Sequence, residues 1–289
     1  MIPTPTHSKN KDTNSQSSFE YDREWALEVR GLTTSFQTRQ GLVDAIRNVS
    51  YRVRRGETLG VVGESGCGKS ITSFSIMGLI EGSGRIRQGE ILFKNQDLLK
   101  KSEKELSSIR GHQMAMIFQE PMTALNPVLS IGEQIDESVM QHLGLSKKEA
   151  RERSVEMLSL VGIPSPRERA DTYPHQLSGG MRQRVMIAMS LSCNPSFLIA
   201  DEPTTALDVT IQAQILELLQ NLQEKFQMSI QFITHDLGVI SEISDRVMVM
   251  YGGHVCEIAP ASEIFDSPRH PYTEALIAAR PKLGSRVEK

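Results

Sequence analysis

An octapeptide in the first quarter of the 289-residue chain, Gly63-Glu-Ser-Gly-Cys-Gly-Lys-Ser70, constrains its fold more than any other feature. It fits the spacing G-x-x-x-x-G-K-[ST] at every fixed position. The apolar residues Thr58 to Val62 before it predict a buried strand, and residues 70–80 after it can form a helix. Between a strand and a helix, such glycines let consecutive backbone N–H groups turn inward around a phosphate, and the helix N-terminus adds the positive end of its dipole. The sequence therefore predicts a phosphate-binding loop within an α/β fold.

Two side chains of this loop carry the chemistry. The Lys69 ammonium supplies a positive charge for the β- and γ-phosphates of a nucleotide, and the Ser70 hydroxyl can ligate Mg²⁺. Cys67 occupies a variable position of the pattern, which favours a small loop residue over a redox switch. The alternative interpretation, a glycine-rich turn that matches by chance, is disfavoured because both flanks have the required pattern.

Composition narrows the class of protein. Hydrophobic residues make up 39% of the chain and charged residues 23%, as in an ordinary globular protein, and no apolar run approaches the roughly 18 residues that a membrane span needs. A net charge of −3 argues against nucleic acid as the main ligand. Residues 1–20 are polar and lack a signal-peptide pattern, which predicts a disordered tail. The 3 cysteines are widely spaced, match no metal-site spacing and indicate a reduced, intracellular protein.

The segment before the phosphate loop is β-rich. Two β-like stretches, Ala26 to Val29 and Ala45 to Val53, flank a polar turn at Thr38 to Gly41. Every second residue from Val49 to Val53 is apolar or aromatic, which predicts a half-exposed antiparallel sheet. Phe36 is the only aromatic residue in the connection, and its ring can either stack on a flat base such as adenine or simply pack against the protein.

The middle of the chain alternates between β and helical patterns. Gly89 to Phe93 predicts an edge strand, and Met114 to Phe118 predicts a buried strand that ends at Gln119. A polar residue at that end of a parallel strand lies where open α/β sheets bind their ligands. The alternative is that the Gln119 side chain only faces solvent. Residues 120–195 indicate a helical insertion in the α/β core. Its third helix is preceded by Leu177-Ser-Gly-Gly-Met181. Ser178 can cap that helix, and the two glycines leave its first N–H groups open to an anion; the alternative is that the motif only caps the helix. The three expected helices are Ile131 to Leu143, Lys147 to Val161 and Gly179 to Ser192.

Acidic and histidine side chains follow two further predicted strands. Phe197 to Glu202 is a buried strand pattern ending in two carboxylates. Asp201 is suited to hold Mg²⁺, and Glu202 is suited to act on a water molecule. Two separate roles are favoured because adjacent side chains on a strand point in different directions. The alternative is that the two carboxylates only form an acidic turn before Pro203. Ser229 to Thr234 predicts a strand before His235, which can bond a terminal phosphate oxygen or be a structural histidine. A helix at residues 210–226 and a hairpin around Gly252-Gly253 complete the expected elements.

The ordered set of motifs resembles the ATP-binding subunit of ATP-binding cassette (ABC) transporters from Trp25 onward. The motifs are residues 63–70, Gln119, Leu177 to Met181, Phe197 to Glu202, Ala206-Leu-Asp208 and His235, and Leu-Ser-Gly-Gly separates this family from other phosphate-loop proteins. More narrowly, residues 119–127 and the closing His270-Pro-Tyr-Thr-Glu-Ala-Leu276 are similar to the oligopeptide/dipeptide and nickel importer branch. The resemblance implies a P-loop NTPase core with a mixed or parallel sheet, an N-terminal antiparallel β-subdomain and an inserted α-helical subdomain.

The resemblance also implies a role for each site residue. Phe36 would stack on adenine, the loop and Lys69 would hold the phosphates, Glu202 would act on the attacking water, and His235 would hold the γ-phosphate. Ser70, Gln119 and Asp201 would arrange Mg²⁺, and Gln119 and Lys69 would also take part in catalysis. Ser178 and Gly180 would face the nucleotide of an opposite subunit, with Asp208 at the seam between the two. The implied contacts with ATP are made by Phe36, Gly63, Glu64, Ser65, Gly66, Cys67, Gly68, Lys69, Ser70, Ile71, Gln119, Ser178, Gly179, Gly180, Asp201, Glu202 and His235.

Partners and location follow from the same resemblance. The chain would pair with a second ABC ATPase, either a paralogue or a second copy, and would drive two membrane permease subunits that receive solute from a substrate-binding protein. It would lie peripherally on the cytoplasmic face of a bacterial inner membrane. The implied domains are a cassette at residues 21–260, with its helical subdomain at about 120–195, and a short C-terminal extension at 261–289. No cysteine follows Cys256, so no iron–sulfur cluster is expected in that extension.

Three other kinds of protein are less consistent with the sequence than a transporter ATPase. A DNA-repair or translation ATPase of the same family needs long coiled coils or two cassettes, and neither pattern is present. A regulatory module with a dead site is disfavoured because Lys69, Asp201, Glu202 and His235 are all intact. A nucleotide kinase has no use for Leu-Ser-Gly-Gly. Within transport, nothing in these residues separates peptides from nickel or another small solute.

Overall fold

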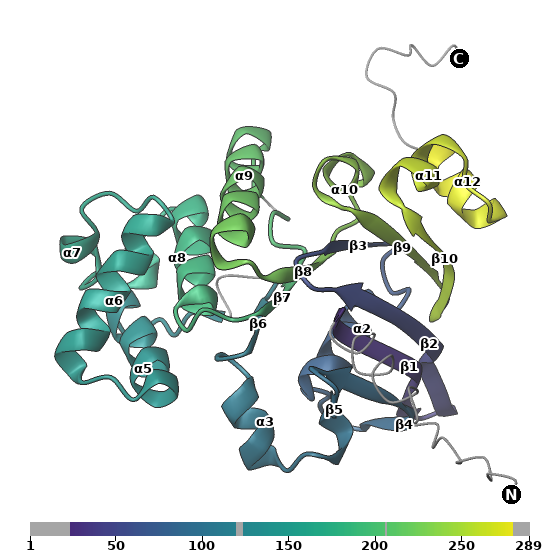
Figure 1. Ribbon diagram of the computed structural model, residues 1–289, viewed down its shortest axis with the longest axis horizontal. Coiled ribbons are helices and arrows are strands. Elements are labelled where there is room, and N and C mark those ends of the chain that lie inside the picture. Colours follow the sequence, from purple (N-terminus) through teal and green to yellow (C-terminus); the bar gives the residue numbers. More distant parts are fainter. Residues whose placement is uncertain (1–23, 120–123, 206, 280–289) are drawn as a thin grey trace, which may run out of the picture.

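The computed structural model describes residues 24–119, 124–205 and 207–279, and within them two sheets and a group of helices form the molecule (Figure 1). The strands are β1 (Trp25–Thr38), β2 (Gly41–Arg54), β3 (Thr58–Val62), β4 (Gly84–Phe93), β5 (Gln96–Asp97), β6 (Met114–Ile117), β7 (Phe197–Asp201), β8 (Ser229–Ile233), β9 (Arg246–Tyr251) and β10 (His254–Pro260). The helices are α2 (Lys69–Met77), η1 (Leu98–Lys100), α3 (Glu103–Ile109), α5 (Ile131–Leu143), α6 (Lys147–Leu160), α7 (Pro166–Arg169), η2 (Pro174–Gln176), α8 (Gly179–Leu191), α9 (Val209–Phe226), α10 (Leu237–Ile243), α11 (Ala261–Asp266) and α12 (Pro271–Ala278).

The larger sheet has six strands in the order β10-β9-β3-β8-β7-β6. Strands β9, β3, β8, β7 and β6 run parallel, and β10 is added antiparallel at one edge. The smaller sheet is antiparallel, with the order β2-β1-β4-β5. The predicted fold class, a phosphate-loop α/β core with a mixed sheet, an antiparallel β part and inserted helices, is therefore confirmed.

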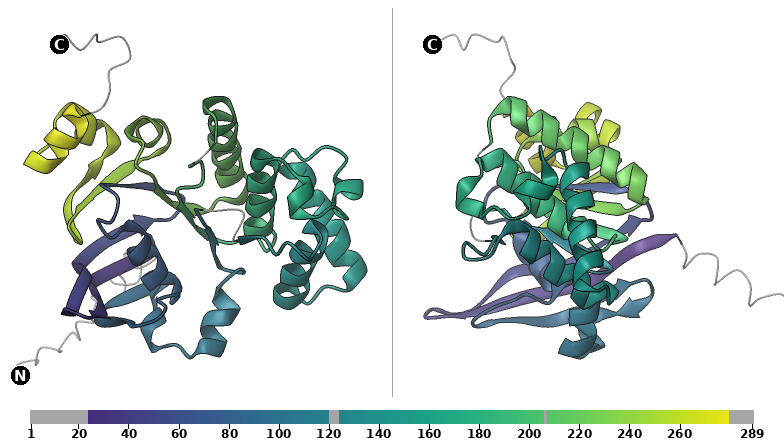
Figure 2. Two further views of the ribbon diagram at one scale, coloured as in Figure 1. Left: turned by 180° about the vertical axis from the view of Figure 1, so that it is seen from behind. Right: turned by 90° about the vertical axis from the view of Figure 1, so that its left-hand side faces the viewer.

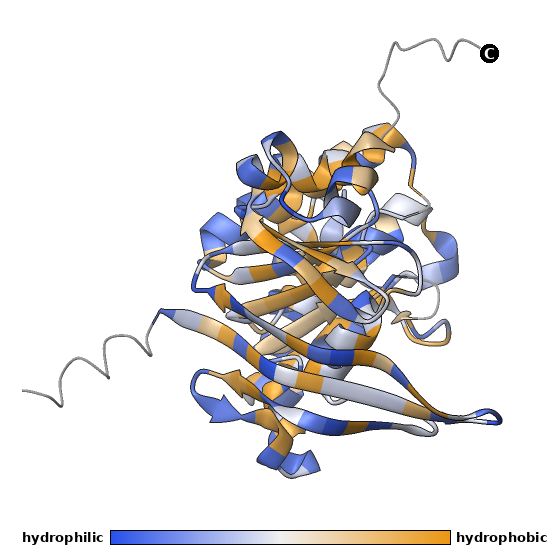
Figure 3. Ribbon diagram, turned by 90° about the vertical axis from the view of Figure 1, so that its right-hand side faces the viewer, coloured by the Kyte–Doolittle hydropathy of each residue, from blue (hydrophilic) through white to orange (hydrophobic). Residues whose placement is uncertain are grey.

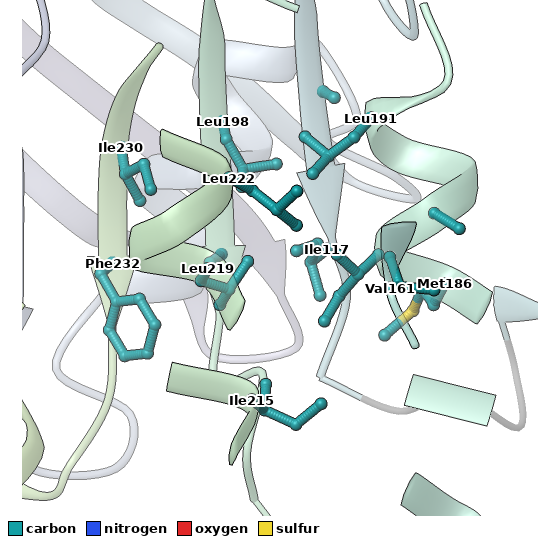
Figure 4. Close-up of a cluster of buried hydrophobic side chains, with 14 of the residues drawn as sticks. Ile117, Val161, Met186, Leu191, Leu198, Ile215, Leu219, Leu222, Ile230 and Phe232 are labelled. Carbon is teal, nitrogen blue, oxygen red and sulfur yellow. The ribbon is translucent and has the colours of Figure 1, made fainter. Parts of the chain in front are cut away.

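Each buried strand of the larger sheet feeds two hydrophobic cores because successive side chains point to opposite faces. In β7, Leu198 and Ala200 join the core beneath the helices, while Phe197 and Ile199 join the core shared with the antiparallel sheet. Figure 4 shows the first of these cores, where the Leu198 side chain lies among side chains of α8, α9 and neighbouring strands. The continuous apolar runs in the sequence reflect this burial on both faces.

The antiparallel sheet is longer than the sequence indicated. β1 and β2 pair from Trp25 to the Thr38–Gly41 closure, so the strand pattern extends past Val29 and includes Phe36, which lies in β1 opposite Val43 rather than in a connection. The ladder continues because only two residues make the turn. This hairpin reaches beyond the rest of its sheet and its tip is hydrophilic (Figure 3). The buried positions Val49, Tyr51 and Val53 confirm the half-exposed pattern that was predicted. β4 likewise begins at Gly84, before the expected Gly89.

The helices α5, α6 and α8 lie within the expected ranges, between β6 and β7 in the chain. Figures 1 and 2 show that they gather beyond the β6 edge of the larger sheet. Ser130 and Ser146 begin α5 and α6 with reciprocal capping boxes, which satisfy backbone donors that a helix start leaves free. The short helix α7 was not predicted. The expected disordered tail at residues 1–20 and the last ten residues of the expected extension lie outside the described part of the chain.

Helix α2 is shorter than its sequence pattern. It begins at Lys69, after Gly68, and ends at Met77 rather than at residue 80. Gly78 has a left-handed conformation with φ of 63°, and its N–H donates to the carbonyls of Phe74 and Ser75. This closure ends the helix because a left-handed residue turns the chain out of the helical path. In residues 24–119, 124–205 and 207–279, no helix has the length and apolar character needed to cross a bilayer.

A buried polar chain fastens the antiparallel sheet to the larger sheet and to α2. The Tyr51 hydroxyl donates to Gln231 Oε1 at 2.6 Å, and Gln231 Nε2 donates to Ser73 Oγ at 3.1 Å. Gln231 lies in β8 and is 0% exposed, so it cannot turn to water for a replacement partner. Because buried amides need their hydrogen bonds, these contacts fix how the phosphate-loop helix sits on the sheet.

Tyr51→Phe is expected to lower the free energy of unfolding by about 1–3 kcal/mol, the typical effect of leaving a buried acceptor unsatisfied. Urea unfolding followed by circular dichroism measures the change. The matched control is Tyr251→Phe, because Tyr251 is 52% exposed and its change should be within about 0.5 kcal/mol of zero. Equal effects of the two variants would show that the Tyr51 hydroxyl does not stabilise the fold in this way.

Candidate nucleotide-binding site

Parallel strands bring most of the predicted site residues to one edge of the larger sheet. Gly63 follows β3, Asp201 ends β7, Gln119 comes two residues after β6, and His235 comes two residues after β8. These four strands are neighbours in the order β3-β8-β7-β6, so their carboxyl ends lie side by side. This is the edge at which open α/β sheets bind ligands.

The phosphate-loop pattern folds into a compact turn that is held by its own lysine. Lys69 is 6% exposed, and its ammonium donates to the carbonyl oxygens of Gly63 at 2.8 Å and Glu64 at 3.0 Å. Cys67 Sγ lies 3.9 Å from the same nitrogen and is itself buried, which favours the structural interpretation of this cysteine. Gly68 precedes α2 with φ of 106° and packs so closely that a Cβ would lie 2.5 Å from Ile46. The loop therefore holds a buried cation at the start of a helix, as phosphate recognition requires.

Asp201 and Ser70 form the part of the site that suits a divalent cation. The Asp201 carboxyl is 2% exposed, and its Oδ1 has no partner among the described residues. Burial is the largest effect on this carboxyl and raises its pKa. The hydrogen bond from the Ser70 hydroxyl lowers the pKa, the nearby Glu202 carboxylate raises it, and the Lys69 ammonium lowers it. A buried, orphaned carboxylate oxygen beside a hydroxyl is a donor set that Mg²⁺ prefers. These residues fit the ion that the sequence predicts.

Glu202, just after β7, contacts residues that follow the two neighbouring strands, β6 and β8. Its Oε2 accepts hydrogen bonds from Gln119 Nε2 at 3.3 Å and from Thr205 Oγ1 at 2.9 Å, and it lies 3.4 Å from His235 Nδ1. Glu202 also has φ of 48°, a left-handed value that few residues with side chains adopt, which turns its side chain out of the β7 strand. The carboxylate is therefore held by one oxygen. Gln119 and His235, which lie far apart in sequence, are brought together on it.

Two contacts in this site were not predicted from the sequence. Thr205 donates to Glu202 and lies three residues beyond it, but a threonine in a turn gives no sequence signal of its own. Tyr272 accepts a hydrogen bond from the Glu64 backbone N–H at 3.3 Å, although 208 residues separate them. The only signal for Tyr272 was its place in the His-Pro-Tyr segment.

Phe36 lines an apolar cavity next to the start of α2. The cavity measures about 430 Å³ and is also lined by Ile71 and Phe74 of α2, and by Phe118 just before Gln119. Phe36 is partly buried, and a Cβ at Gly84 would lie 2.6 Å from its ring. Because Ile71 directly follows Ser70, the cavity adjoins the phosphate loop. Its aromatic and aliphatic lining is compatible with a flat ring.

The residues of the Leu-Ser-Gly-Gly motif do not join this cluster. Ser178 is exposed, and its Oγ accepts the N–H of Met181 as the cap of α8. Gly179 and Gly180 form the first turn of that helix. Helix α8 lies with the other helices of residues 131–191, whereas α2 lies beneath the antiparallel sheet (Figure 1). Asp208 caps α9 by accepting the Ile211 N–H at 3.0 Å, and the preceding Ala206 lies outside the described residues.

Comparison with known proteins agrees with this geometry. Residues 46–205 match the family model described as ABC transporter, and residues 256–289 match the model for the oligopeptide/dipeptide transporter C-terminal region. The dipeptide transport ATP-binding protein DppD of Bacillus subtilis is 56% identical over 261 residues, covering 90% of this chain and 78% of DppD. The oligopeptide transport ATP-binding protein OppD of the same organism is 56% identical over 264 residues, covering 91% and 74%.

Solved structures give the same result. The chain superimposes on the ATP-binding cassette MJ0796, solved as a dimer in a post-hydrolysis state bound to ADP and Pi, with a TM-score of 0.73, 28% identity and coverage of 81% of this chain and 98% of that one. For cbiO1 of Clostridium perfringens, part of the ABC transporter complex cbiONQ, the TM-score is 0.71 at 28% identity, with 84% and 92% covered.

Together, the fold, the residues at the sheet edge and these matches define an ATP-binding cassette that hydrolyses ATP. The chain belongs to the ABC transporter family. Within that family it carries the C-terminal region of the oligopeptide/dipeptide transporters.

Proposed function

We propose that this chain is the ATP-hydrolysing subunit of a membrane importer for oligopeptides or dipeptides. The observation that carries the proposal is the identity of 54–56% to the peptide transport proteins DppD, OppD and AppD of Bacillus subtilis, over at least 90% of this chain. The site independently supports the ATP-hydrolysing part of the proposal, since Lys69, Asp201, Glu202 and His235 are all present at one edge of the sheet.

The arrangement suits hydrolysis by positioning and charge stabilisation, which phosphoryl transfer requires. We assign to residues 63–71 the binding of the ATP phosphates, with Lys69 as the charge, and to Phe36 the adenine face of the cavity. Glu202 orients the attacking water through Oε1, because the described contacts occupy Oε2. His235 is 64% exposed and has Nε2 left to contact the γ-phosphate.

Ser70, Gln119 and Asp201 are assigned to hold Mg²⁺. The bound ion neutralises charge on the phosphate oxygens. Gln119 reaches the site from β6 and already touches Glu202, so its amide can respond both to the ion and to the carboxylate that acts on water. The ordinary preference of Mg²⁺ for oxygen ligands fits all three side chains.

Turnover is proposed to require two cassettes. Ser178, Gly179 and Gly180 lie on α8, outside the cluster formed by Lys69 and Glu202, with open N–H groups at a helix start. In a symmetric pair they would reach the nucleotide seated on the partner's phosphate loop, with Asp208 at the seam. The solved MJ0796 cassette is itself a dimer. A paralogue or a second copy of this chain can supply the partner surface.

The remaining assignments concern the membrane. Residues 120–195, inserted between β6 and β7, would receive a coupling helix from a membrane permease, although residues 120–123 lie outside the described part. The cassette, residues 21–260, would work at the cytoplasmic face of a bacterial inner membrane, with residues 261–289 as its extension. ATP would close the pair of cassettes and release would open it, so that the permeases alternate their access to a substrate-binding protein.

A mixing experiment tests the shared site. Lys69→Ala and Ser178→Arg chains should each be inactive alone, yet a one-to-one mixture should recover about a quarter of the normal ATPase rate. The reason is that half of the pairs contain one chain of each variant, and each of these mixed pairs has one of its two sites intact. The control mixes Lys69→Ala with Glu202→Gln, where both defects belong to the same half-site and no activity should return. Equal recovery of ATPase activity in the two mixtures would contradict the shared site. So would the absence of recovery in the first mixture if the unmodified chain hydrolyses ATP by itself.

Uptake measurements test the solute. Bacteria that lack this chain should fail to accumulate a labelled dipeptide or tetrapeptide and should accumulate nickel normally. The reverse pattern would favour a nickel importer, which the sequence motifs do not exclude. Normal uptake of both, together with association of the purified protein with ribosomes or nucleic acid, would favour a non-transport ATPase of the same family.

A further inference from the structure

The C-terminal helix α12 reaches back to the phosphate loop. It lies beside β10, at the end of the larger sheet opposite α5, α6 and α8 (Figure 1). Its Tyr272 hydroxyl accepts the Glu64 backbone N–H at 3.3 Å. The Tyr272 ring packs on the ring of Tyr251, which ends β9, with centroids 4.4 Å apart. A segment at the far end of the chain therefore contacts the second residue of the loop.

The N–H that Tyr272 binds belongs to the peptide unit that joins Gly63 to Glu64. The carbonyl of that same unit, Gly63 C=O, accepts a hydrogen bond from Lys69 Nζ at 2.8 Å. Peptide units are planar, so a rotation of this one moves the N–H and the C=O together. Tyr272 at one end and Lys69 at the other thus hold a single plane in place.

This peptide plane helps to aim the Lys69 ammonium. An ammonium has three N–H donors, and two of them are directed to the carbonyls of Gly63 and Glu64. Among the described residues, the third N–H has only the weak sulfur acceptor of Cys67 at 3.9 Å, which leaves it for a phosphate oxygen. If the Gly63–Glu64 unit rotated, the ammonium would lose one of the two acceptors that direct it.

Tyr272 is itself firmly placed. Its backbone N–H donates to His270 Nδ1 at 3.1 Å, where His270 caps α12. Glu257 of β10 accepts the backbone N–H groups of Arg269 at 2.9 Å and His270 at 3.1 Å. The next residue, Thr273, is 0% exposed. The hydroxyl therefore approaches the loop from a helix that is fastened to the larger sheet.

We propose that Tyr272 is a positioning residue for ATP binding, which acts through the Gly63–Glu64 peptide unit to keep Lys69 aimed at the phosphates. A ligand-binding loop that is already held in its bound shape loses less conformational freedom when the ligand arrives. The proposal rests on the phosphate-binding role given above to residues 63–71. It assigns to the His-Pro-Tyr segment a task within the nucleotide site of the same chain.

The test removes the hydroxyl and keeps the ring. Tyr272→Phe in the full chain should weaken ATP binding about twofold to tenfold, the range expected for loss of one hydrogen bond. In steady-state ATPase assays KM for ATP should rise while kcat at saturating ATP stays close to normal, a separation that a general loss of structure would not produce. Tyr251→Phe is the matched control, because it removes a hydroxyl from the other ring of the same pair and should leave ATP binding unchanged.

A double-mutant cycle with Glu64→Pro identifies the path of the effect. Proline has no N–H, so Tyr272→Phe should cause no further loss of ATP affinity in that background. Additive losses would show that the hydroxyl acts elsewhere, and unchanged affinity in Tyr272→Phe alone would overturn the proposal. If Glu64→Pro does not fold, the two phenylalanine variants decide the matter by themselves. Lys69→Ala separates the two hypotheses, because normal ATP binding by that variant would refute the phosphate-loop assignment itself.

Discussion

Glu202→Gln is expected to bind ATP normally and to hydrolyse it at least about a hundredfold more slowly, since removal of a positioned acid–base group typically costs 10²–10⁴ in rate. The amide keeps the shape of the side chain and its contacts with Gln119 and Thr205, so the geometry around it should persist. What is lost is the negative charge that polarises the water. Single-turnover hydrolysis and equilibrium ATP binding measure the two effects separately.

The matched control for that substitution is Glu242→Gln. Glu242 is an exposed acid on α10, outside the cluster around Glu202, and its loss should leave turnover close to normal. Near-normal hydrolysis by Glu202→Gln would remove Glu202 from its proposed role. A loss of ATP binding in the same variant would instead indicate that Glu202 supports the structure of the site.

Gly63→Ala is expected to lower the free energy of unfolding by roughly 2–5 kcal/mol and to weaken ATP binding at least about tenfold, because overpacking and left-handed strain act together there. Gly63 has φ of 149°, and a Cβ would lie 2.2 Å from the Met250 carbonyl oxygen and 2.7 Å from Cys67 Sγ. The first of these neighbours is backbone of β9, which cannot move aside without shifting the sheet. The loop would have to move instead, and with it the carbonyl that directs Lys69.

Gly66→Ala provides the comparison within the same loop. Gly66 has φ of 79° but open space around the position of a Cβ, so only the conformational cost of about 1–2 kcal/mol applies. Urea unfolding and ATP titration of both variants test the difference. Equal losses at the two positions would show that the close approach of β9 to Gly63 does not constrain the loop.

Much of the site was predictable because its signals are local. Lys69 and Ser70 follow a strand pattern at a fixed spacing, and Asp201 and His235 come at or just after the ends of short, largely apolar runs that predict buried strands. The placement of Gln119 at a strand end was predicted for the same reason, whereas the exact strand limits were not. Phe36 was assigned to a connection because pairing with Val43 extends the strand beyond what its own residues indicate.

The contacts between distant residues were not predictable in this way. Tyr272 gave no sign that it binds the loop, because 208 residues separate it from Glu64 and no periodicity connects them. Thr205 lies in a turn whose direction depends on the left-handed Glu202 before it. In both cases the partner is chosen by packing rather than by the pattern around the residue.

The sequence by itself determined the side chains that we propose for binding and hydrolysing a nucleotide, and that most of them end or follow a buried strand or open a helix. Those properties depend on residue type and on a spacing of a few positions, so they can be read along the chain. Only the tertiary structure decided that β7 lies between β6 and β8, so that Gln119 and His235 both reach Glu202, and that α12 returns to the phosphate loop. Strand order and helix docking follow from the burial of whole apolar faces against one another, a long-range effect that no short stretch of sequence contains.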